Sequence, residues 1–106
     1  MYSRITQLEI DTLRVSMDDA VEIFKTEVLP KLREQPGFEG VYVMSTPEGK
    51  ALLMSFWESE QAAEQSVASG FYAEQLEEHV TLFRAPPGRE HYHVDIAELA
   101  TPISAD

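Results

Sequence analysis

Hydrophobic and polar positions change their spacing several times along the chain, and each change predicts a new element. The opening stretch SRITQLEI has β-branched residues and no breaker, which predicts a strand over residues 3–13. After Ser16, a residue typical of helix N-caps, apolar residues recur at helical spacing. Pro30 lacks the N–H that a complete helical ladder needs, so we expect a kink there, and Pro36-Gly37 ends the helix.

The remaining pattern predicts a hairpin, a second helical segment and a last strand. Residues 38–59 read as two strands joined by a turn at 46–49, and so short a connection requires antiparallel pairing. Residues 58–83 have a helical pattern that is interrupted at Ser69-Gly70. The stretch HYHVDIAEL, residues 91–99, predicts the last strand.

This order of elements is that of an α+β protein with the ferredoxin-like βαββαβ arrangement. Such a fold has a four-stranded antiparallel sheet with helices packed on one face. A chain of 106 residues fits one domain. We therefore predict a single domain over residues 1–106, with its core at about 3–98 and a loose tail at 101–106.

The predicted hairpin is apolar on both of its faces. Residues 41–44 are all apolar, and so are most residues from Ala51 to Trp57. Helices can cover only one face of the sheet, and an exposed apolar face of this size favours association. We therefore expect a homodimer in which a second subunit covers the open face.

Composition narrows the classes of partner. The formal net charge of −11 and the pI near 4.5 oppose binding to nucleic acid or to an anionic membrane. Six glutamates and no Lys or Arg occur from Ala51 to Phe83, which predicts a solvated acidic face and disfavours anionic ligands on that side. The absence of cysteine excludes disulfides and thiolate chemistry. No apolar run has the length of a signal peptide or a membrane span, so we expect a cytoplasmic protein.

The last predicted strand contains H-Y-H-V-D, in which alternation places His91, His93 and Asp95 on one face. These side chains could bind a metal or form the solvated side of an ordinary strand. We expect the second, with Tyr92 and Val94 directed to the core and the histidines toward solvent or the dimer partner. Two ligands spaced by two residues rarely complete a site, so we predict no metal site.

Three stretches together resemble one protein family. LREQPGFEGVYVM, KALLMSFWESEQAAEQS and FYAEQLEEHV are similar to segments of the antibiotic biosynthesis monooxygenase (ABM) family of dimeric α+β barrels, over residues 3–98. The resemblance implies a pocket in each subunit between sheet and helices. It also implies oxidation of polyphenolic or quinol substrates by molecular oxygen without metal or flavin.

Another branch of this family degrades haem, and its pattern fits poorly here. That branch has an Asn on the first strand, where this chain has Thr6 and Gln7. Its helical Trp would fall near Ser66, and its His ligand would match His79 only after a shift of one residue. The comparison disfavours haem degradation.

We therefore expect a cofactor-independent monooxygenase acting on a small aromatic quinol or polyphenol. His79 shares an inward helical stripe with Tyr72, and its intrinsic pKa near 6.5 suits a general base. Tyr72 would hold a substrate oxygen. The further predicted substrate-binding residues are Gln7, Met44, Phe56, Trp57, Phe71, Leu76, Phe83 and Arg84.

Each of these residues also has a purely structural interpretation. His79 could be a core histidine bonded to a backbone carbonyl, and Trp57 a packing residue. Arg84 could be a solvated cation at a helix end. The alternative function is a non-catalytic dimeric protein, of the binding or stress-response type, that holds a small apolar molecule.

Overall fold

The computed structural model describes residues 1–100 and forms one sheet with helices on one side. Its elements, in chain order, are β1 (Tyr2–Glu9), α1 (Met17–Ile23), the π-helical turn η1 (Phe24–Val28), α2 (Leu29–Arg33), β2 (Phe38–Ser45), β3 (Lys50–Trp57), α3 (Glu60–Ala68), α4 (Phe71–Glu78), the 3₁₀ turn η2 (Val80–Leu82) and β4 (Gly88–His93). The predicted α+β, ferredoxin-like order is confirmed. The tail predicted at 101–106 lies outside the described residues.

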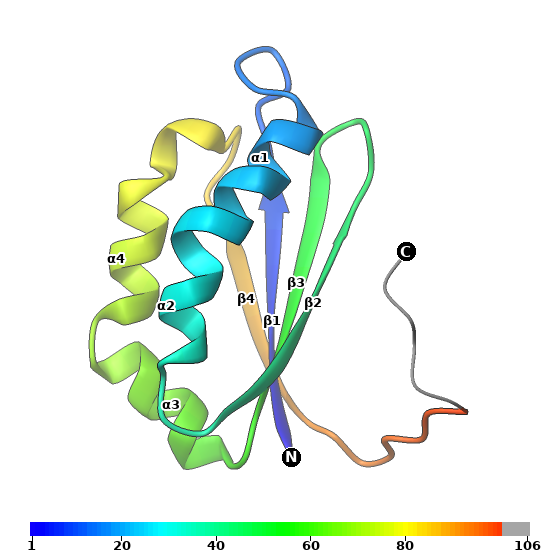
Figure 1. The fold of residues 1–106 in the computed structure, drawn as a ribbon, viewed down its shortest axis with the longest axis vertical. Helices are drawn as coiled ribbons and strands as arrows, with labels where there is room; N and C mark the ends of the chain where they lie inside the picture. Colours follow the sequence, from blue (N-terminus) through cyan, green and yellow to red (C-terminus); the bar gives the residue numbers. More distant parts are fainter. Residues whose placement is uncertain (101–106) are drawn as a thin grey trace.

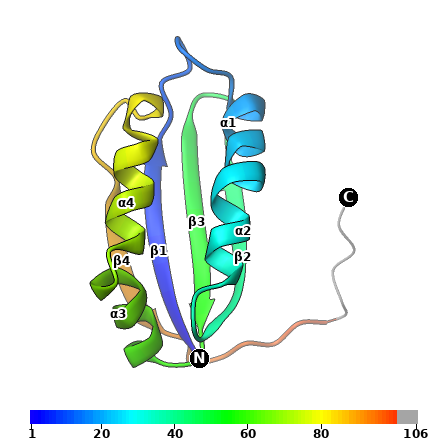
Figure 2. The same ribbon diagram turned by 60° about the vertical axis from the view of Figure 1, so that its left-hand side comes forward.

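The sheet is antiparallel, with strand order β2-β3-β1-β4. All helices lie on the same face (Figure 1). Figure 2 shows two separate helical layers on that face: α1 and α2 run over β2 and β3, while α3 and α4 run over β1 and β4. The space between the two helical layers lies above the central strands.

A π-helical turn interrupts the first helix, close to the predicted kink. Pro30 has no N–H to donate, and its ring would clash with the carbonyl four residues earlier in a regular α-helix. The wider turn η1 avoids this conflict, and Leu29 N–H donates to Phe24 O instead. The chain then continues as α2, so Pro30 changes the local geometry without ending the helix.

The second helical segment breaks at the predicted position. Gly70 has a φ of +86°, a backbone conformation that side chains with a Cβ rarely adopt, and α4 starts at the next residue. Two strands differ from their predicted bounds. β1 ends at Glu9 rather than near residue 13, and β4 runs from Gly88 to His93 rather than from His91 to Leu99.

The buried core is divided into two clusters at opposite ends of β1. The first is built around Tyr2 and Trp57, and Trp57 is fully buried. The second is built around Ile10 and Met17. Because each cluster packs the helices against one end of the sheet, the middle of the helix-facing surface need not be tightly filled.

The opposite face of the sheet carries apolar side chains that no helix covers. Tyr42 is 44% exposed and Met44 45% exposed, and Tyr92 is 48% exposed. Tyr42 packs edge-on against Phe56 of the neighbouring strand, with ring centroids 5.9 Å apart. No helix among residues 1–100 combines the length and the apolar character that crossing a membrane requires.

Candidate active site

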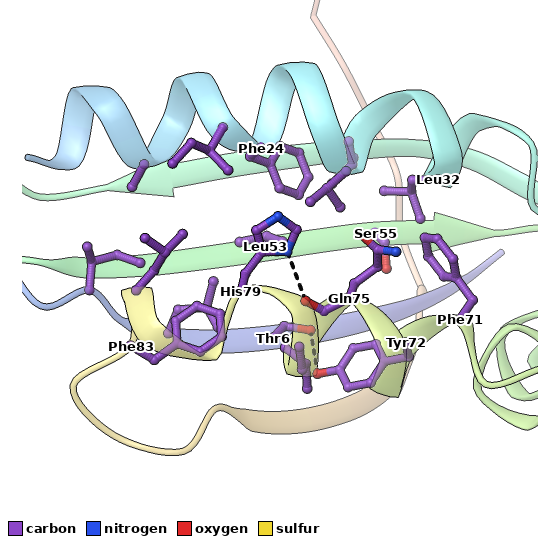
Figure 3. Close-up of a pocket in the computed structure, with 18 of the residues that line it drawn as sticks. Thr6, Phe24, Leu32, Leu53, Ser55, Phe71, Tyr72, Gln75, His79 and Phe83 are labelled. Carbon is purple, nitrogen blue, oxygen red and sulfur yellow. Dashed lines mark hydrogen bonds between the residues drawn. The ribbon is translucent and has the colours of Figure 1, made fainter. Parts of the chain in front are cut away.

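A cavity of about 120 Å³ lies between the sheet and the two helical layers, in the gap between the core clusters (Figure 3). Most of its wall is apolar, with aromatic rings from Phe24, Phe71 and Phe83. The polar side chains in its wall come from β1, β3 and α4 and the residue after it: Arg4, Thr6, Ser55, Tyr72, Gln75 and His79. A concave apolar site with a few polar groups is typical of small-molecule binding.

His79 directly follows α4, and its side chain is 11% exposed. Its Nδ1 lies 3.0 Å from the backbone carbonyl oxygen of Gln75. This oxygen can only accept a hydrogen bond, so Nδ1 carries the proton in the neutral ring. Nε2 then has a free lone pair. It is buried and has no hydrogen-bond partner within residues 1–100. The ring is therefore held in the orientation and tautomer of a proton acceptor.

Glu27 faces His79 from the other helical layer. Its Oε1 lies 3.8 Å from His79 Nε2, and its side chain is 52% exposed. Glu27 belongs to the π-helical turn η1, and so does Phe24 of the cavity wall. π-helical turns are frequent at functional sites because they shift side chains out of regular α-helical register. Here the wider turn places Phe24 and Val28 in the wall of the cavity and Glu27 opposite His79.

Tyr72 is joined to the central strand of the sheet. Its hydroxyl lies 3.1 Å from Thr6 Oγ1, and both side chains line the cavity (Figure 3). A hydroxyl pair has one proton to share internally and one left to donate elsewhere. The pair can thus donate a hydrogen bond to an oxygen of a bound molecule.

Arg4 is the least expected group in the wall, because it is only 3% exposed. Its guanidinium lies 4.9 Å from the centre of the Trp57 ring and 4.7 Å from that of Tyr72. One N–H donates to the Ala63 carbonyl at 3.4 Å. Burial is the main cause that lowers the pKa of Arg4 to about 10; Tyr72 opposes the shift and the nearby Arg89 contributes to it.

Gln75 adds an unpartnered acceptor to the same wall. It is 8% exposed, and its Oε1 is buried without a hydrogen-bond partner within residues 1–100. Buried polar atoms are nearly always paired, so an unpaired one that lines a cavity indicates a place for a ligand or water.

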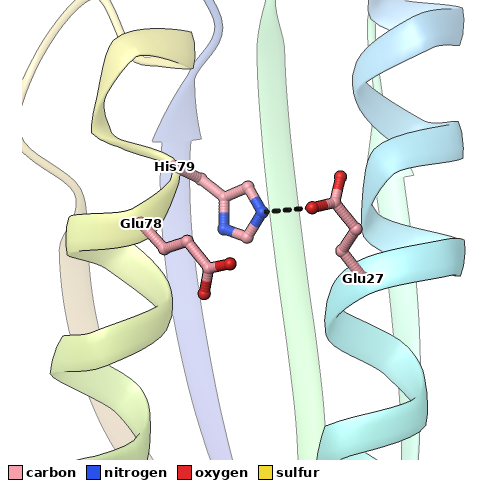
Figure 4. Close-up of side chains that lie close together, drawn as sticks. All are labelled: Glu27, Glu78 and His79. Carbon is pink, nitrogen blue, oxygen red and sulfur yellow. Dashed lines mark ion pairs between the residues drawn. The ribbon is translucent and has the colours of Figure 1, made fainter.

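Glu27, Glu78 and His79 bring one ligand atom each to within 4.8 Å of one another (Figure 4). Both carboxylates are exposed, and Glu78 already lies 3.7 Å from Lys31 Nζ. Exposed acidic groups of this kind are common without an ion. We interpret the group as the ionic contact between the two helical layers.

Comparison with known families decides the identity. The sequence profile of the antibiotic biosynthesis monooxygenase family matches residues 5–85. The chain belongs to the ABM family. This match begins within β1 and continues past η2, so β4 alone of the elements lies wholly outside it. A comparison with curated protein sequences finds no match.

Solved structures agree with the ABM assignment. A monooxygenase from the ActVA-Orf6 gene of Streptomyces coelicolor, in complex with nanaomycin D, is 25% identical, with a TM-score of 0.73 over 94% of this chain and 92% of that one. A protein of unknown function from Nitrosomonas europaea is 19% identical, with a TM-score of 0.72 over 94% of each chain. SnoaB, a cofactor-independent oxygenase from Streptomyces nogalater, is 9% identical, with a TM-score of 0.72 over 91% of this chain and 94% of that one. The last two likenesses show the fold alone.

The ABM cavity brings together about half of the residues predicted from the sequence. The predicted residues that do line the cavity are all on or near α4, and they are Tyr72, His79, Phe71, Leu76 and Phe83. The structural interpretation of His79 is seen in its contact with a backbone carbonyl, and Nε2 has no partner, so its role as a general base stays a prediction.

The other predicted substrate-binding residues lie elsewhere. Gln7, Met44 and Phe56 are on the open face of the sheet, where Gln7 and Met44 border a shallow groove. Trp57 is a core residue whose Nε1 donates to Ser55 Oγ at 3.0 Å. Arg84 is exposed beyond η2. The prediction that these side chains line the same pocket is therefore wrong, because strand alternation directs three of them to the other face.

The predicted orientation of the last strand is also wrong. His91 pairs with Arg4 and His93 with Tyr2, so both histidines share the helix-facing side of the sheet. Their rings pack against Tyr2, at centroid distances of 5.8 and 5.2 Å. Tyr92 instead lies on the open face. Within residues 1–100, the ligand atoms of these histidines and Asp95 form no metal-binding group.

Sequence reasoning missed Arg4, Thr6, Ser55 and Gln75. A signal for the first two was present, because Tyr2, Leu8 and Ile10 are apolar and share their alternation phase. That phase places the even-numbered residues of β1 inside, polar ones included. A signal for Gln75 was also present, because it lies three residues after Tyr72 and four before His79, on the helical stripe that contains both.

Proposed function

We propose that this ABM-family protein is a cofactor-independent monooxygenase that oxidises a small aromatic quinol with molecular oxygen. The observation that carries the proposal is the free, buried Nε2 of His79 in the wall of an apolar cavity. Oxygenation without a cofactor needs an electron-rich substrate, a base that removes its phenolic proton, and a site that excludes water. The apolar wall of the cavity would receive the aromatic substrate and limit the access of water, and His79 would be the base.

The overall reaction would convert a quinol and O₂ into a hydroxyquinone and one water. His79 Nε2 takes the phenolic proton, and the resulting anion adds O₂ at a ring carbon to form a carbon–oxygen bond. Protonation of the terminal oxygen by the His79 imidazolium gives a hydroperoxide. The O–O bond then breaks as the C–H proton leaves, which releases water and forms the new carbonyl. The substrate supplies all the electrons that reduce O₂.

Proton transfer would create two charges, a positive one on His79 and a negative one on the substrate oxygen, and each would have a stabilising group in the cavity wall. Glu27, 3.8 Å from His79 Nε2, would stabilise the imidazolium formed when the base takes the proton. The hydroxyls of Tyr72 and Thr6 would donate to the substrate oxygen as it becomes anionic. Both interactions are stronger after proton transfer than before it, which is the condition for catalysis.

We also propose that the protein is a homodimer whose subunits meet through the open face of the sheet. The face offers Tyr42, Met44 and Tyr92, each nearly half exposed, next to half-buried Met54 and Phe56. Exposed apolar patches on this scale mark association surfaces. A dimer formed in this way would leave both cavities on the outer, helical sides.

The direct test is oxygen uptake by chelator-treated protein with a panel of small hydroquinones, corrected for their spontaneous oxidation. We expect uptake above the spontaneous rate for at least one of them, and none from heat-unfolded protein. Tight binding of a hydroquinone without uptake would support the alternative, a non-catalytic small-molecule-binding protein, and would overturn the enzymatic proposal.

A further inference from the structure

Arg4 is a buried cation for which the described residues offer no counter-charge. Arg4 is the third residue of β1, its side chain lies in the cavity wall, and the residue is 3% exposed. No carboxylate within residues 1–100 lies within 4.0 Å of its guanidinium; the ion pairs of this part of the chain involve other residues. Burying a charge is costly unless it is paired.

The contacts that Arg4 makes leave most of its donors free. A guanidinium has five N–H groups in a planar fork, and Arg4 makes one hydrogen bond within residues 1–100, to Ala63 O at 3.4 Å. The rings of Trp57 and Tyr72 contribute cation–π attraction, but they accept no hydrogen bond in the plane of the fork. The group is therefore held between two rings, and its remaining N–H groups donate to no other residue within residues 1–100.

A second cation lies beside the first. The guanidinium of Arg89 is 5.1 Å from the centre of the Tyr72 ring, the same ring that Arg4 contacts. Arg89 pairs with Thr6 across β1 and β4, so it projects on the helix-facing side. The next residue on that side of β4 is His91, whose Nε2 is buried without a hydrogen-bond partner within residues 1–100.

This concentration of positive charge is unusual in its setting. The chain has 8 Lys and Arg against 19 Asp and Glu, yet two of its arginines meet at one tyrosine ring, inside or beside the cavity. Burial, together with Arg89 and Arg4, lowers the pKa of His91, while Glu60 and Glu64 oppose the shift. Arg89 is exposed, but two arginines at one side of the cavity give it a positive local potential, which attracts an anion.

We propose that Arg4, supported by Arg89, binds an anionic oxygen group on the aromatic substrate, either a carboxylate or an ionised phenol. The planar fork of Arg4 matches two oxygens of such a group, and the apolar part of the cavity receives the ring. This inference rests on the proposed function for the aromatic character of the ligand. It departs from the expectation, drawn from the acidic run, that anionic ligands are disfavoured.

The volume of the cavity favours a small ligand. At about 120 Å³ it is smaller than the dry cavity of about 150 Å³ that holds benzene in another protein, but this cavity is open on one side, so substituents of a ligand can extend from its mouth. Single-ring ligands are therefore the appropriate probes.

The test compares two ligands that match in size and differ in charge. Binding of 2,5-dihydroxybenzoate and 2,5-dihydroxybenzamide is measured by calorimetry under nitrogen, so that no oxidation contributes. We expect the carboxylate to bind at least about tenfold more tightly than the neutral amide. 4-Nitrophenol, which ionises between pH 6 and pH 8 while Arg4 stays charged, is measured at both pH values to show whether an ionised phenol is recognised in place of a carboxylate. Equal affinities for the carboxylate and the amide, together with no gain in affinity for the ionised nitrophenol, would overturn the inference whatever any variant does.

Variants then assign the preference to Arg4. Arg4→Gln is expected to abolish the carboxylate preference while leaving amide binding unchanged, and Arg89→Gln to reduce the preference several-fold. Arg33→Gln, a change of an exposed arginine on α2, should leave it intact. A preference that persists in Arg4→Gln would overturn the assignment to Arg4. If Arg4→Gln does not fold, Arg4→Lys keeps the charge without the fork and should weaken the preference.

Stability separates recognition from a purely structural role. Because Arg4 is buried without an acid, its replacement by Met should leave the melting temperature unchanged or higher. A large loss of stability, with carboxylate preference unchanged in the folded fraction, would mean that Arg4 is structural. The outcome is independent of catalysis. A carboxylate preference without oxygen uptake would support the anion site and overturn the enzymatic proposal. Oxygen uptake without a preference for either anion would support the enzymatic proposal and overturn the anion site.

Discussion

His79 Nε2 lies 3.8 Å from Glu27 Oε1, so the residue after α4 faces the π-helical turn η1 across the space between the two helical layers (Figure 4). Nδ1 of the same ring is occupied by the Gln75 carbonyl. The histidine thus has one nitrogen fixed by its own helix and the other directed to the opposite layer. This arrangement is the basis of the role proposed for it.

Replacing His79 should remove most of the activity without unfolding the protein. His79→Gln keeps a polar side chain of similar size but cannot take the phenolic proton, so we expect the rate of oxygen uptake to fall about 10²–10⁴-fold. Glu27→Gln should reduce the rate less, by several-fold, because the imidazolium loses its partner. His93→Gln, an exposed histidine on β4, is the matched control. Full activity in His79→Gln would remove the residue from the mechanism.

The hydroxyl of Tyr72 should matter for turnover more than for folding. Tyr72→Phe removes the group that lies 3.1 Å from Thr6 Oγ1 and leaves the ring contacts of both arginines in place. We expect oxygen uptake to fall about 10–100-fold, and the free energy of unfolding to fall by about 1 kcal/mol. Tyr42→Phe, on the open face, should change neither. Unchanged uptake in Tyr72→Phe would show that the hydroxyl does not contact the substrate.

The open face of the sheet should determine the oligomeric state. Met44→Lys places a charge among the exposed apolar residues of that face, so we expect a monomer by sedimentation velocity at concentrations where the natural protein is a dimer. Leu13→Lys is the control, because Leu13 is 97% exposed in a loop away from the sheet. A natural protein that sediments as a monomer would contradict the proposed interface.

Stability should fall as the pH drops below about 6.5, in part because of His91. Burial first, then Arg89 and Arg4, lower the pKa of His91 in the folded state. The unfolded chain therefore binds a proton before the folded protein does. The contribution of this group is present above its unfolded pKa near 6.5 and is lost as the pH falls through the folded pKa.

Denaturant titrations between pH 7.5 and 5.5 measure this effect. His91→Gln should flatten the dependence of unfolding free energy on pH in that window, and His93→Gln should not. A slope that is the same in His91→Gln and in the natural protein would show that other groups are responsible.

Most of the fold follows from local sequence. The hairpin turn at 46–49 and the break at Gly70 have strong turn and breaker signals, and both lie where they were predicted. The ends of β1 and β4 do not follow from the pattern. Beyond β1, the Asp11 side chain accepts a hydrogen bond from Leu13 N–H and forms an ion pair with Arg14. These contacts stabilise a turn that directs the chain away from the sheet.

The site is less accessible to sequence reasoning, because it is built from both helical layers and from one face of the sheet. His79 and Tyr72 were identified because helical spacing places them on one stripe. Arg4 was overlooked because a charged residue in a strand is ordinarily assigned to the solvated face. His91 was assigned to the wrong side for the related reason that Tyr92 is the more apolar neighbour. On this sheet the outer face is apolar and part of the inner face is polar, so hydrophobicity alone gives the wrong orientation.

The most direct test of the central proposal is the fate of the two atoms of ¹⁸O₂ during turnover by chelator-treated protein. The product is reduced at once, so that its carbonyl oxygens do not exchange with water, and is analysed by mass spectrometry. A monooxygenase that takes its electrons from the quinol incorporates one ¹⁸O per product molecule and releases the other as water. An unlabelled quinone formed together with hydrogen peroxide would contradict the account, because O₂ would then only accept electrons.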